Sequence, residues 1–252
     1  MEREFAALVT ALRVVTRTAS GWSFDIIAAA SGTMGAVDLV VPVKPLRAAK
    51  SRLRGAADRG VGDPDAHAAL ALALAHDTVA AVRAARAVRR LLVVSSDPVV
   101  AAELAAVGVE VVPDVTDGLN AALRHGTGLL RAADPGAPVG ALQADLPALR
   151  PAELDAALHD AAALFATGAR RAFCPDAEGT GTTLLLAGAG VDLDPRFGAG
   201  SAARHRESGA VPLLAAGPGL RRDVDTGDDL CAAAELGLGP HTRAVLAPTG
   251  RC

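Results

Sequence analysis

Apolar and polar residues follow a regular pattern from residue 37 onward. Short runs rich in valine and leucine predict buried strands, and longer amphipathic stretches predict helices. In the first part of the chain we expect strands at 37–43, 91–95, 109–112 and 139–142, and helices at 65–88, 98–107 and 118–133. Such a series of strand, helix and strand folds into a parallel sheet covered by helices.

The pattern becomes looser after residue 150. We expect a helix at 151–166, short strands at 171–174, 183–187, 211–214 and 220–224, and a last helix at 228–236. A Gly-rich stretch lies between the second and third of these strands. The sequence therefore predicts an α/β domain whose second half forms a smaller region of mixed strands.

Residues 1–33 differ from the rest of the chain. Their apolar run, Ile26 to Ala30, is too short for the apolar region of a signal peptide. Met34 stands shortly before the first predicted strand. We expect residues 1–33 to be an extension outside the fold and residues 34–252 to form a single domain. The extension is also a candidate for an over-extended start, with Met34 as the native first residue.

Composition narrows the functional classes. A net charge of −3 and an aromatic content of 2% disfavour a nucleic-acid binder, which needs basic surfaces or aromatic stacking platforms. No apolar run approaches the about 20 residues of a membrane span. The cysteines, Cys174, Cys231 and Cys252, form neither a zinc-binding pattern nor a disulfide framework, so we expect a cytoplasmic protein.

The only two lysines of the chain, Lys44 and Lys50, lie in the loop after the first predicted strand. Arg47, Arg52 and Arg54 accompany them. In open α/β sheets, ligands bind beyond the carboxyl ends of the strands, where ammonium groups can neutralise a polyphosphate. A solvated basic face explains this loop equally well when the loop is taken alone.

The common nucleotide-binding motifs do not occur in this sequence. Neither lysine follows a glycine at the spacing of a GxxxxGK[ST] loop, and no GxGxxG follows the first predicted strand. The GxSxG motif of α/β-hydrolases does not occur either. These observations disfavour a P-loop ATPase, a kinase, a classical dehydrogenase and an α/β-hydrolase.

Acidic residues follow two of the predicted strands. Asp145 comes just after the strand at 139–142, and Asp223 and Asp225 flank Val224. On a strand, Asp223 and Asp225 would face the same side. Carboxylates at such positions suit magnesium, which prefers oxygen ligands and takes one or two carboxylates plus substrate phosphates. For the second pair the alternative is that Asp225 or Thr226 caps the last helix.

Several short motifs occur together in one order: Val41-Pro-Val-Lys-Pro-Leu-x-x-x-Lys-Ser-Arg-Leu53, Gln143-Ala-Asp-Leu-Pro147, Gly179-Thr-Gly-Thr-Thr183, Phe197-Gly-x-x-Ser201 and Asp223-Val-Asp-Thr226. Together they resemble the guanylyltransferases of deazaflavin coenzyme F-420 biosynthesis. The sequence looks most like the actinobacterial members, which use phosphoenolpyruvate as the acceptor. The resemblance implies a GT-A-like nucleotidyltransferase fold, a Rossmann-like three-layer α/β/α arrangement, with GTP as the donor and Mg²⁺ as the metal.

The resemblance assigns roles to the charged residues already singled out. It implies that Asp145 and Asp223 hold Mg²⁺, with Asp225 adjacent. It also implies that Lys44 and Lys50 contact the GTP phosphates. Lys44, Lys50 and Asp145 are therefore the predicted catalytic residues.

The same resemblance predicts the acceptor side and one nucleoside contact. Phosphoenolpyruvate would contact Thr182, Gly198 and Ser201, and Asn120 would contact the nucleoside. Taken alone, the Gly/Thr stretch at 179–183 is equally typical of a flexible hairpin loop. A short helix is expected after Ser201, and one of its residues could reach an acceptor carboxylate: Arg204, His205 or Arg206.

The implied reaction is transfer of GMP from GTP to phosphoenolpyruvate, with release of pyrophosphate and formation of enolpyruvyl-diphospho-guanosine. Three alternatives remain open at the level of sequence: 2-phospho-L-lactate as the acceptor, another acceptor such as a molybdopterin or sugar phosphate, and a non-catalytic GTP-binding module. A downstream transferase of the same pathway is a candidate partner.

Overall fold

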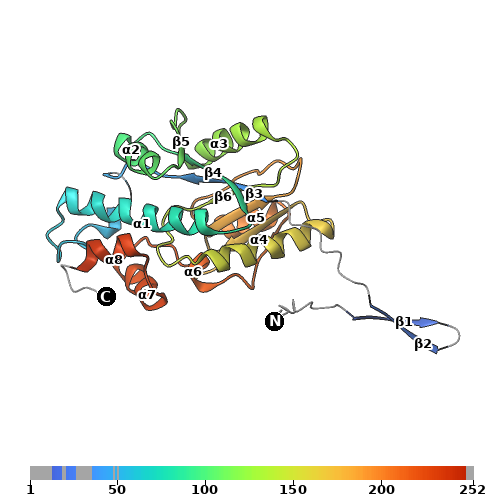
Figure 1. The fold of residues 1–252 in the computed structure, drawn as a ribbon. Helices are drawn as coiled ribbons and strands as arrows, with labels where there is room; N and C mark the ends of the chain where they lie inside the picture. The colour runs from blue at the N-terminus through green and yellow to red at the C-terminus, as the bar shows by residue number, and fades with distance from the viewer. Residues whose placement is uncertain (1–12, 19–20, 27–35, 48, 50, 248–252) are drawn as a thin grey trace, which may run out of the picture. The chain divides into compact units, whose positions relative to one another are not determined.

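The computed structural model of the protein describes residues 13–18, 21–26, 36–47, 49 and 51–247 (Figure 1). The chain divides into two compact units, Met1–Met34 and Gly35–Cys252. In the first unit, β1 (Arg13–Thr18) and β2 (Gly21–Ile26) form an antiparallel pair in which Arg13 lies opposite Ile26. The hydrophobic pattern did not predict these two strands.

The second unit is built on a seven-stranded sheet with the order β5-β4-β3-β6-β8-β7-β9. β8 pairs antiparallel with β6 and β7, whereas the other neighbours pair in parallel. The predicted mostly parallel sheet with a mixed second half is therefore confirmed. The strands are β3 (Val37–Pro42), β4 (Val88–Val94), β5 (Glu110–Val112), β6 (Val139–Leu142), β7 (Arg171–Pro175), β8 (Thr182–Ala187) and β9 (Ala210–Pro212).

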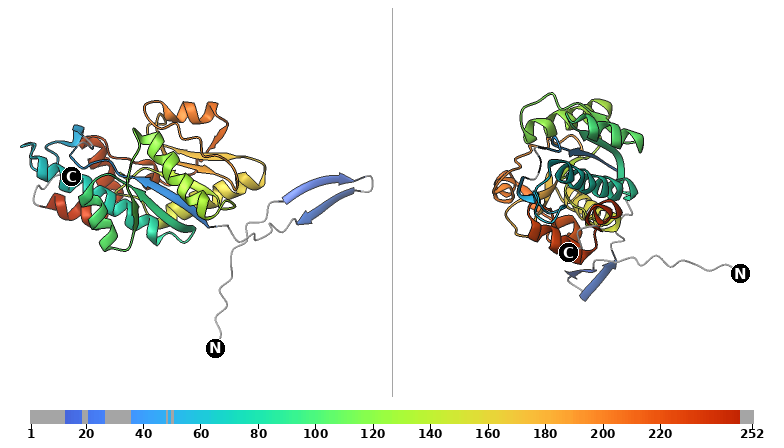
Figure 2. Two further views of the ribbon diagram at one scale, coloured as in Figure 1. Left: turned by 90° about the horizontal axis from the view of Figure 1, so that it is seen from above. Right: turned by 90° about the vertical axis from the view of Figure 1, so that its left-hand side faces the viewer.

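Helices cover both faces of this sheet (Figure 1, Figure 2). On one face α3 packs against β3, β4 and β6, and on the other α1 and α4 pack together. These layers form the predicted α/β/α arrangement. The helices are α1 (Pro64–Ala84), α2 (Pro98–Ala106), α3 (Leu119–Ala133), α4 (Pro151–Ala166), α5 (Ser201–Glu207), α6 (Pro218–Arg221), α7 (Gly227–Leu236) and α8 (Pro240–Leu246), with a 3-10 turn at Ser51–Leu53.

The prediction of a strand at 220–224 is wrong, because the short helix α6 occupies part of this segment. Pro218 stands at the first helical position, where its missing N–H costs nothing. Gly219 lies so close to the start of α4 that an added Cβ would be 2.3 Å from the carbonyl oxygen of Ala148. Its N–H donates to Glu153 Oε1 at 3.1 Å. Contacts with a distant segment therefore override the local strand pattern.

The direction of β8 decides where the functional side chains gather. Because β8 runs against its neighbours, its first residue, Thr182, lies at the edge where the parallel strands end. Lys44 follows β3 at that edge, Asp145 follows β6, and Asp176 follows β7 directly. One edge of the sheet thus collects groups from four strands, as expected for ligand binding in open α/β sheets.

Two cysteines lie among the described residues, and their side chains differ in chemical state. Cys174, on β7, is a free thiol, and its burial raises its pKa to about 11. Cys231, on α7, is disulfide-bonded, which the absence of a disulfide framework in the sequence did not predict. Within the described residues, no helix combines the length and apolar character needed to cross a bilayer.

Replacing Asp77 with alanine is expected to lower the free energy of unfolding by about 2 kcal/mol. The buried Asp77 carboxylate on α1 accepts the N–H groups of His241 (3.0 Å) and Thr242 (2.8 Å), which begin α8. Asp77→Ala leaves both donors without this acceptor. Asp65→Ala is the matched change in the exposed first turn of α1, with an expected cost of about 0.5 kcal/mol or less. Equal losses in urea unfolding would contradict the capping role.

Candidate active site

A cavity of about 680 Å³ lies at the carboxyl edge of the sheet. This volume is within the range of about 300–1,000 Å³ that is usual for small-molecule sites. Its walls come from the loops after β3, β6 and β7, from the loop before α5 and from the segment between α6 and α7. Most of the predicted site residues line it: Lys44, Asp145, Thr182, Gly198, Ser201, Asp223 and Asp225.

Two predicted site residues remain, Lys50 and Asn120. Lys50 lies outside the described residues. Asn120, near the start of α3, directs both polar atoms of its side chain at the backbone of Phe197: Oδ1 accepts the N–H at 2.8 Å, and Nδ2 donates to the carbonyl at 3.1 Å. The amide is thus engaged within the protein, and positioning Phe197 fits this geometry better than the predicted nucleoside contact.

Asp145 is held at the cavity by its backbone and its neighbour. The N–H of Leu146 donates to Thr78 Oγ1 on α1 at 2.9 Å, and the carbonyl of Asp145 accepts the N–H of Val224 at 3.1 Å. Asp145 is only 7% exposed. Its position is therefore fixed by contacts from two other parts of the chain.

The Val224 contact also explains how Asp223 and Asp225 reach the cavity. The prediction placed them on a strand, but they lie between α6 and α7. Val224 is fully buried and bonded to the Asp145 backbone, while Asp223 and Asp225 on either side of it line the cavity. Asp223 and Asp225 therefore lie at the cavity on an irregular segment that is hydrogen-bonded to Asp145, rather than on a strand.

Asp176 is a further acid that sequence reasoning missed. It is buried, lines the cavity and lies directly after β7. Carboxylate oxygens of Asp176, Glu178 and Asp223 lie within 4.8 Å of one another, which could hold a metal ion. The signal was present in the sequence, because Asp176 follows an expected strand just as Asp145 does.

Asp176 also orders the Gly/Thr hairpin between β7 and β8. Its Oδ1 accepts the N–H of Thr180 at 2.8 Å, and its Oδ2 accepts the N–H of Gly181 at 2.6 Å. A Cβ on Gly181 would lie 2.3 Å from Asp176 Oδ2, so the approach requires glycine. The carbonyl of Thr180 accepts the N–H of Ala202 at 3.1 Å. The hairpin is thus anchored at both ends of its turn, which argues against the flexible-loop alternative.

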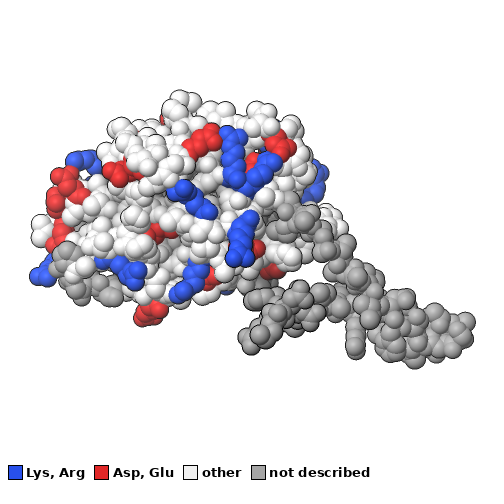
Figure 3. Space-filling model, in the orientation of Figure 1, with Lys and Arg blue, Asp and Glu red and all other residues white. Residues whose placement is uncertain are grey.

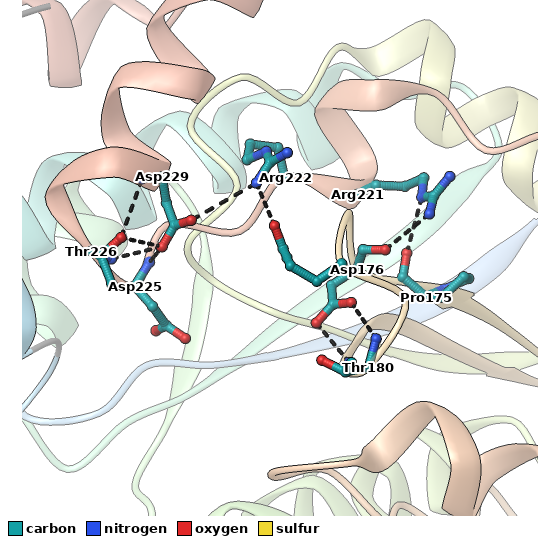
Figure 4. A network of polar contacts seen from close by, with 10 residues as sticks. Pro175, Asp176, Thr180, Arg221, Arg222, Asp225, Thr226 and Asp229 are labelled. Carbon is teal, nitrogen blue, oxygen red and sulfur yellow. Dashed lines mark hydrogen bonds and ion pairs between the residues drawn. The ribbon is translucent and has the colours of Figure 1, made fainter.

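Two arginines hold the acidic wall in place (Figure 4). Arg222 Nη1 contacts Glu178 Oε1 at 2.7 Å and Asp229 Oδ1 at 3.8 Å. Arg221 Nη2 donates to the carbonyl of Asp176 at 3.0 Å. Neutralising cations beside several carboxylates reduce the repulsion that would otherwise spread the acids apart.

The capping alternative is confirmed for Thr226 and not for Asp225. Thr226 is the N-cap, and its hydroxyl and the Asp229 carboxylate form a capping box. In Figure 4 the carboxylate of Asp225 points away from this box. Since Thr226 and Asp229 supply the cap, the Asp225 side chain is directed to the cavity, which it lines.

His205 lies beneath the acceptor side of the cavity. It is fully buried on α5, with its ring 5.8 Å from that of Phe173 and 5.2 Å from that of Phe197, measured between centroids. Nδ1 lies 2.9 Å from Thr182 Oγ1, and Nε2 accepts the N–H of Arg196 at 3.0 Å. Burial, and to a lesser extent nearby Arg204, lowers the pKa of His205 to about 4. The imidazole is therefore neutral at pH 7.

Comparison with curated proteins shows close relatives. The chain is 56% identical over 215 residues to the phosphoenolpyruvate guanylyltransferase of Streptomyces scabiei, covering 83% of this chain and 95% of that protein. It is 54% identical over 214 residues to the protein of the same name from Geodermatophilus obscurus, covering 84% and 95%. A relative with this name from Rhodococcus opacus is 46% identical over 223 residues, covering 82% and 89%. A scan against protein-family models found no match.

Solved structures share the fold at low sequence identity. A nucleotide-diphospho-sugar transferase from Desulfovibrio desulfuricans matches with a TM-score of 0.59 and 19% identity, covering 85% of this chain and 94% of that one. A nucleotidyl transferase from Methanothermobacter matches with a TM-score of 0.54 and 21% identity, covering 80% and 97%. A Mycobacterium tuberculosis protein in complex with manganese matches with a TM-score of 0.50 and 20% identity, covering 79% and 98%.

The solved structures share the fold, and the curated relatives together with the cavity at the carboxyl edge of the sheet define an enzyme of the nucleotidyltransferase class. The predicted GT-A-like fold is confirmed. Within that class the identity to the curated relatives is decisive: the chain belongs to the phosphoenolpyruvate guanylyltransferase family.

Proposed function

We propose that the protein transfers GMP from GTP to phosphoenolpyruvate and releases pyrophosphate, which yields enolpyruvyl-diphospho-guanosine. The observation that carries this proposal is the composition of one cavity in a member of this family. A basic loop and several carboxylates line one part of its wall, and buried hydroxyls and glycines line another. The first set suits a metal-bound polyphosphate, and the second suits a small phosphorylated acid.

The acidic wall fits a magnesium ion. Its donors are carboxylate oxygens, the ligand type that Mg²⁺ prefers, and a few of them suffice because phosphates and waters complete the coordination. We assign the ion to Asp145 and Asp223, with Asp225 adjacent, and add Asp176 on its position beside Asp223. When bound, Mg²⁺ supplies positive charge that stabilises the phosphates as negative charge shifts between them.

The basic loop fits the triphosphate. Lys44 and Arg52 line the cavity beside the acids. We assign Lys44, together with Lys50 from the sequence, to the GTP phosphates, where their ammonium groups act as compact positive charges. Both lysines then stabilise the pyrophosphate as it leaves.

The acceptor side fits the small acid. Thr182 and Ser201 are buried hydroxyl residues that face the cavity. Gly198 has a φ of +116°, which glycine adopts readily, and it presents bare backbone to the cavity that it lines. We propose that these three residues orient phosphoenolpyruvate through its phosphate and carboxylate oxygens.

In the proposed reaction a phosphate oxygen of phosphoenolpyruvate attacks the α-phosphorus of GTP. The new bond joins the two phosphorus atoms through that oxygen, and the bond from the α-phosphorus to the β-phosphate oxygen breaks. The attacking oxygen is already anionic at pH 7, so the step needs no general base. The protein contributes by placing the reactants in line and by neutralising charge.

Measuring pyrophosphate release with each candidate acceptor distinguishes between them. The purified protein with GTP and Mg²⁺ is supplied in parallel with phosphoenolpyruvate, 2-phospho-L-lactate, a sugar phosphate or no acceptor. We expect release with phosphoenolpyruvate and none without an acceptor. Faster release with 2-phospho-L-lactate would assign that acceptor. GTP binding without release in every sample would favour a binding module and contradict the proposal.

Other properties of the protein follow as proposals. On the face shown in Figure 3, acidic and basic side chains are interspersed over the described surface, which supports small-molecule substrates rather than nucleic acid. We propose a cytoplasmic enzyme whose product passes to a downstream transferase of the same pathway. Residues 34–252 are proposed as the catalytic domain, with residues 1–33 outside it.

A further inference from the structure

The hydrogen bonds of His205 determine which ring nitrogen carries its proton. The backbone N–H of Arg196 can only donate, so Nε2 must present its lone pair. In the neutral imidazole the proton then resides on Nδ1. Because Nδ1 lies 2.9 Å from Thr182 Oγ1, it donates to that hydroxyl. Both partners of the ring are thus assigned from the network.

This assignment fixes what Thr182 can do. Since its oxygen accepts from His205, its own hydroxyl proton must go to another acceptor. Thr182 is 5% exposed and lines the cavity, so a ligand bound in the cavity could supply that acceptor. An anionic oxygen, on a phosphate or a carboxylate, is the acceptor that gains most from such a donor.

His205 also holds the opposite part of the acceptor wall. Its Nε2 fixes the N–H of Arg196, the next residue is clamped by the Asn120 amide, and Gly198 follows directly. One buried ring therefore connects β8 with the loop that leads to α5. Displacing the ring would move both groups that face the ligand.

We propose that His205 is a positioning residue that makes Thr182 a hydrogen-bond donor toward an anionic oxygen of the acceptor and holds the loop at Gly198 against it. This inference rests on the proposed acceptor site. His205 itself does not contact the substrate, because it is fully buried behind Thr182. Its neutral state at pH 7, which follows from its lowered pKa, agrees with the donor and acceptor roles of its two nitrogens.

Two amide substitutions separate the two hydrogen bonds. In His205→Asn the amide nitrogen can take the place of Nδ1 and donate to Thr182. In His205→Gln the longer amide can take the place of Nε2 and accept from Arg196, while the donor to Thr182 is lost. We expect His205→Gln to raise the KM for phosphoenolpyruvate about tenfold more than His205→Asn does, because the loss of one hydrogen bond weakens binding by about that factor. The KM for GTP should stay within about twofold in both variants.

A coupling test addresses Thr182 directly. Thr182→Val removes the hydroxyl at nearly constant shape, so adding His205→Gln to it should raise the KM for phosphoenolpyruvate little further. Full additivity would overturn the proposal, as would equal increases in the KM for both substrates. Glu207→Gln, an exposed change on the same helix, is the control for unrelated effects of substitution.

The tautomer can be read without activity. In ¹⁵N NMR of the full chain, we expect His205 Nδ1 to give the signal of a protonated nitrogen and Nε2 that of an unprotonated one at pH 7. The opposite assignment would overturn the proposal even in an active enzyme. Wild-type turnover with phosphoenolpyruvate tests the proposed function, so failure of that function is distinguished from failure of the inference about His205.

Discussion

Asp145→Asn is expected to slow pyrophosphate release from GTP about 1,000-fold, because it removes one negative charge from the wall that we assign to Mg²⁺. Asparagine keeps the size of the side chain, so the change removes charge and little else. The Leu146 and Val224 backbone bonds that hold this position do not involve the carboxylate. These backbone bonds remain in Asp145→Asn, so the variant should keep the wild-type fold.

The measurement for Asp145 compares kcat with thermal unfolding in the same preparations. Asp160→Asn, an exposed change on α4, removes the same charge from a residue that does not line the cavity, and it is expected to leave both quantities unchanged. A normal kcat in Asp145→Asn would refute the metal role of this residue. A large fall in both kcat and stability would show that the carboxylate acts on the fold instead.

Asp176→Asn is expected to lower kcat/KM for phosphoenolpyruvate about 100-fold, and to destabilise the fold as well. Both Asp176 oxygens accept hairpin N–H groups, from Thr180 and Gly181. An asparagine amide places an NH₂ group against one of these donors, which removes a charge-assisted hydrogen bond and leaves that N–H without its acceptor. Thr182 follows this turn directly, so the acceptor side should be displaced.

Glu178→Gln is the matched change for Asp176. Glu178 belongs to the same group of carboxylates, but it is exposed and paired with Arg222. We expect less than a tenfold loss in kcat/KM, because an exposed ion pair contributes little. If Glu178→Gln were as damaging as Asp176→Asn, the hairpin contacts would not explain the effect. Metal binding by Glu178 as well as Asp176 would then be the better account.

Much of the fold could be predicted from the sequence because its strands are short apolar runs bounded by clear breaks. Residues 139–142 and 151–166 were predicted as a strand and a helix with the bounds that the structure gives them. The strand predicted at 220–224 was wrong, since Gly219 lies against the start of α4 and the short helix α6 takes up part of this segment. Contacts between distant segments are invisible to periodicity.

The residues of the candidate site, too, could be predicted from the sequence only in part. Asp145 could be found because it follows a buried strand, and the same rule would have found Asp176 after β7. The clustering of Asp223 and Asp225 was expected from strand alternation. In the structure it depends instead on the hydrogen bond from Val224 to Asp145, a residue far away in the sequence. Side-chain partners that far apart cannot be read from local spacing.

The fate of the α-phosphate tests the central claim most directly. GTP labelled at the α-phosphorus is supplied with Mg²⁺ and phosphoenolpyruvate, and the products are separated and identified by mass. The account predicts that the label enters one new compound containing both guanosine and the enolpyruvyl group, while the pyrophosphate released is unlabelled. Label found only in GTP or in free GMP would contradict GMP transfer to this acceptor.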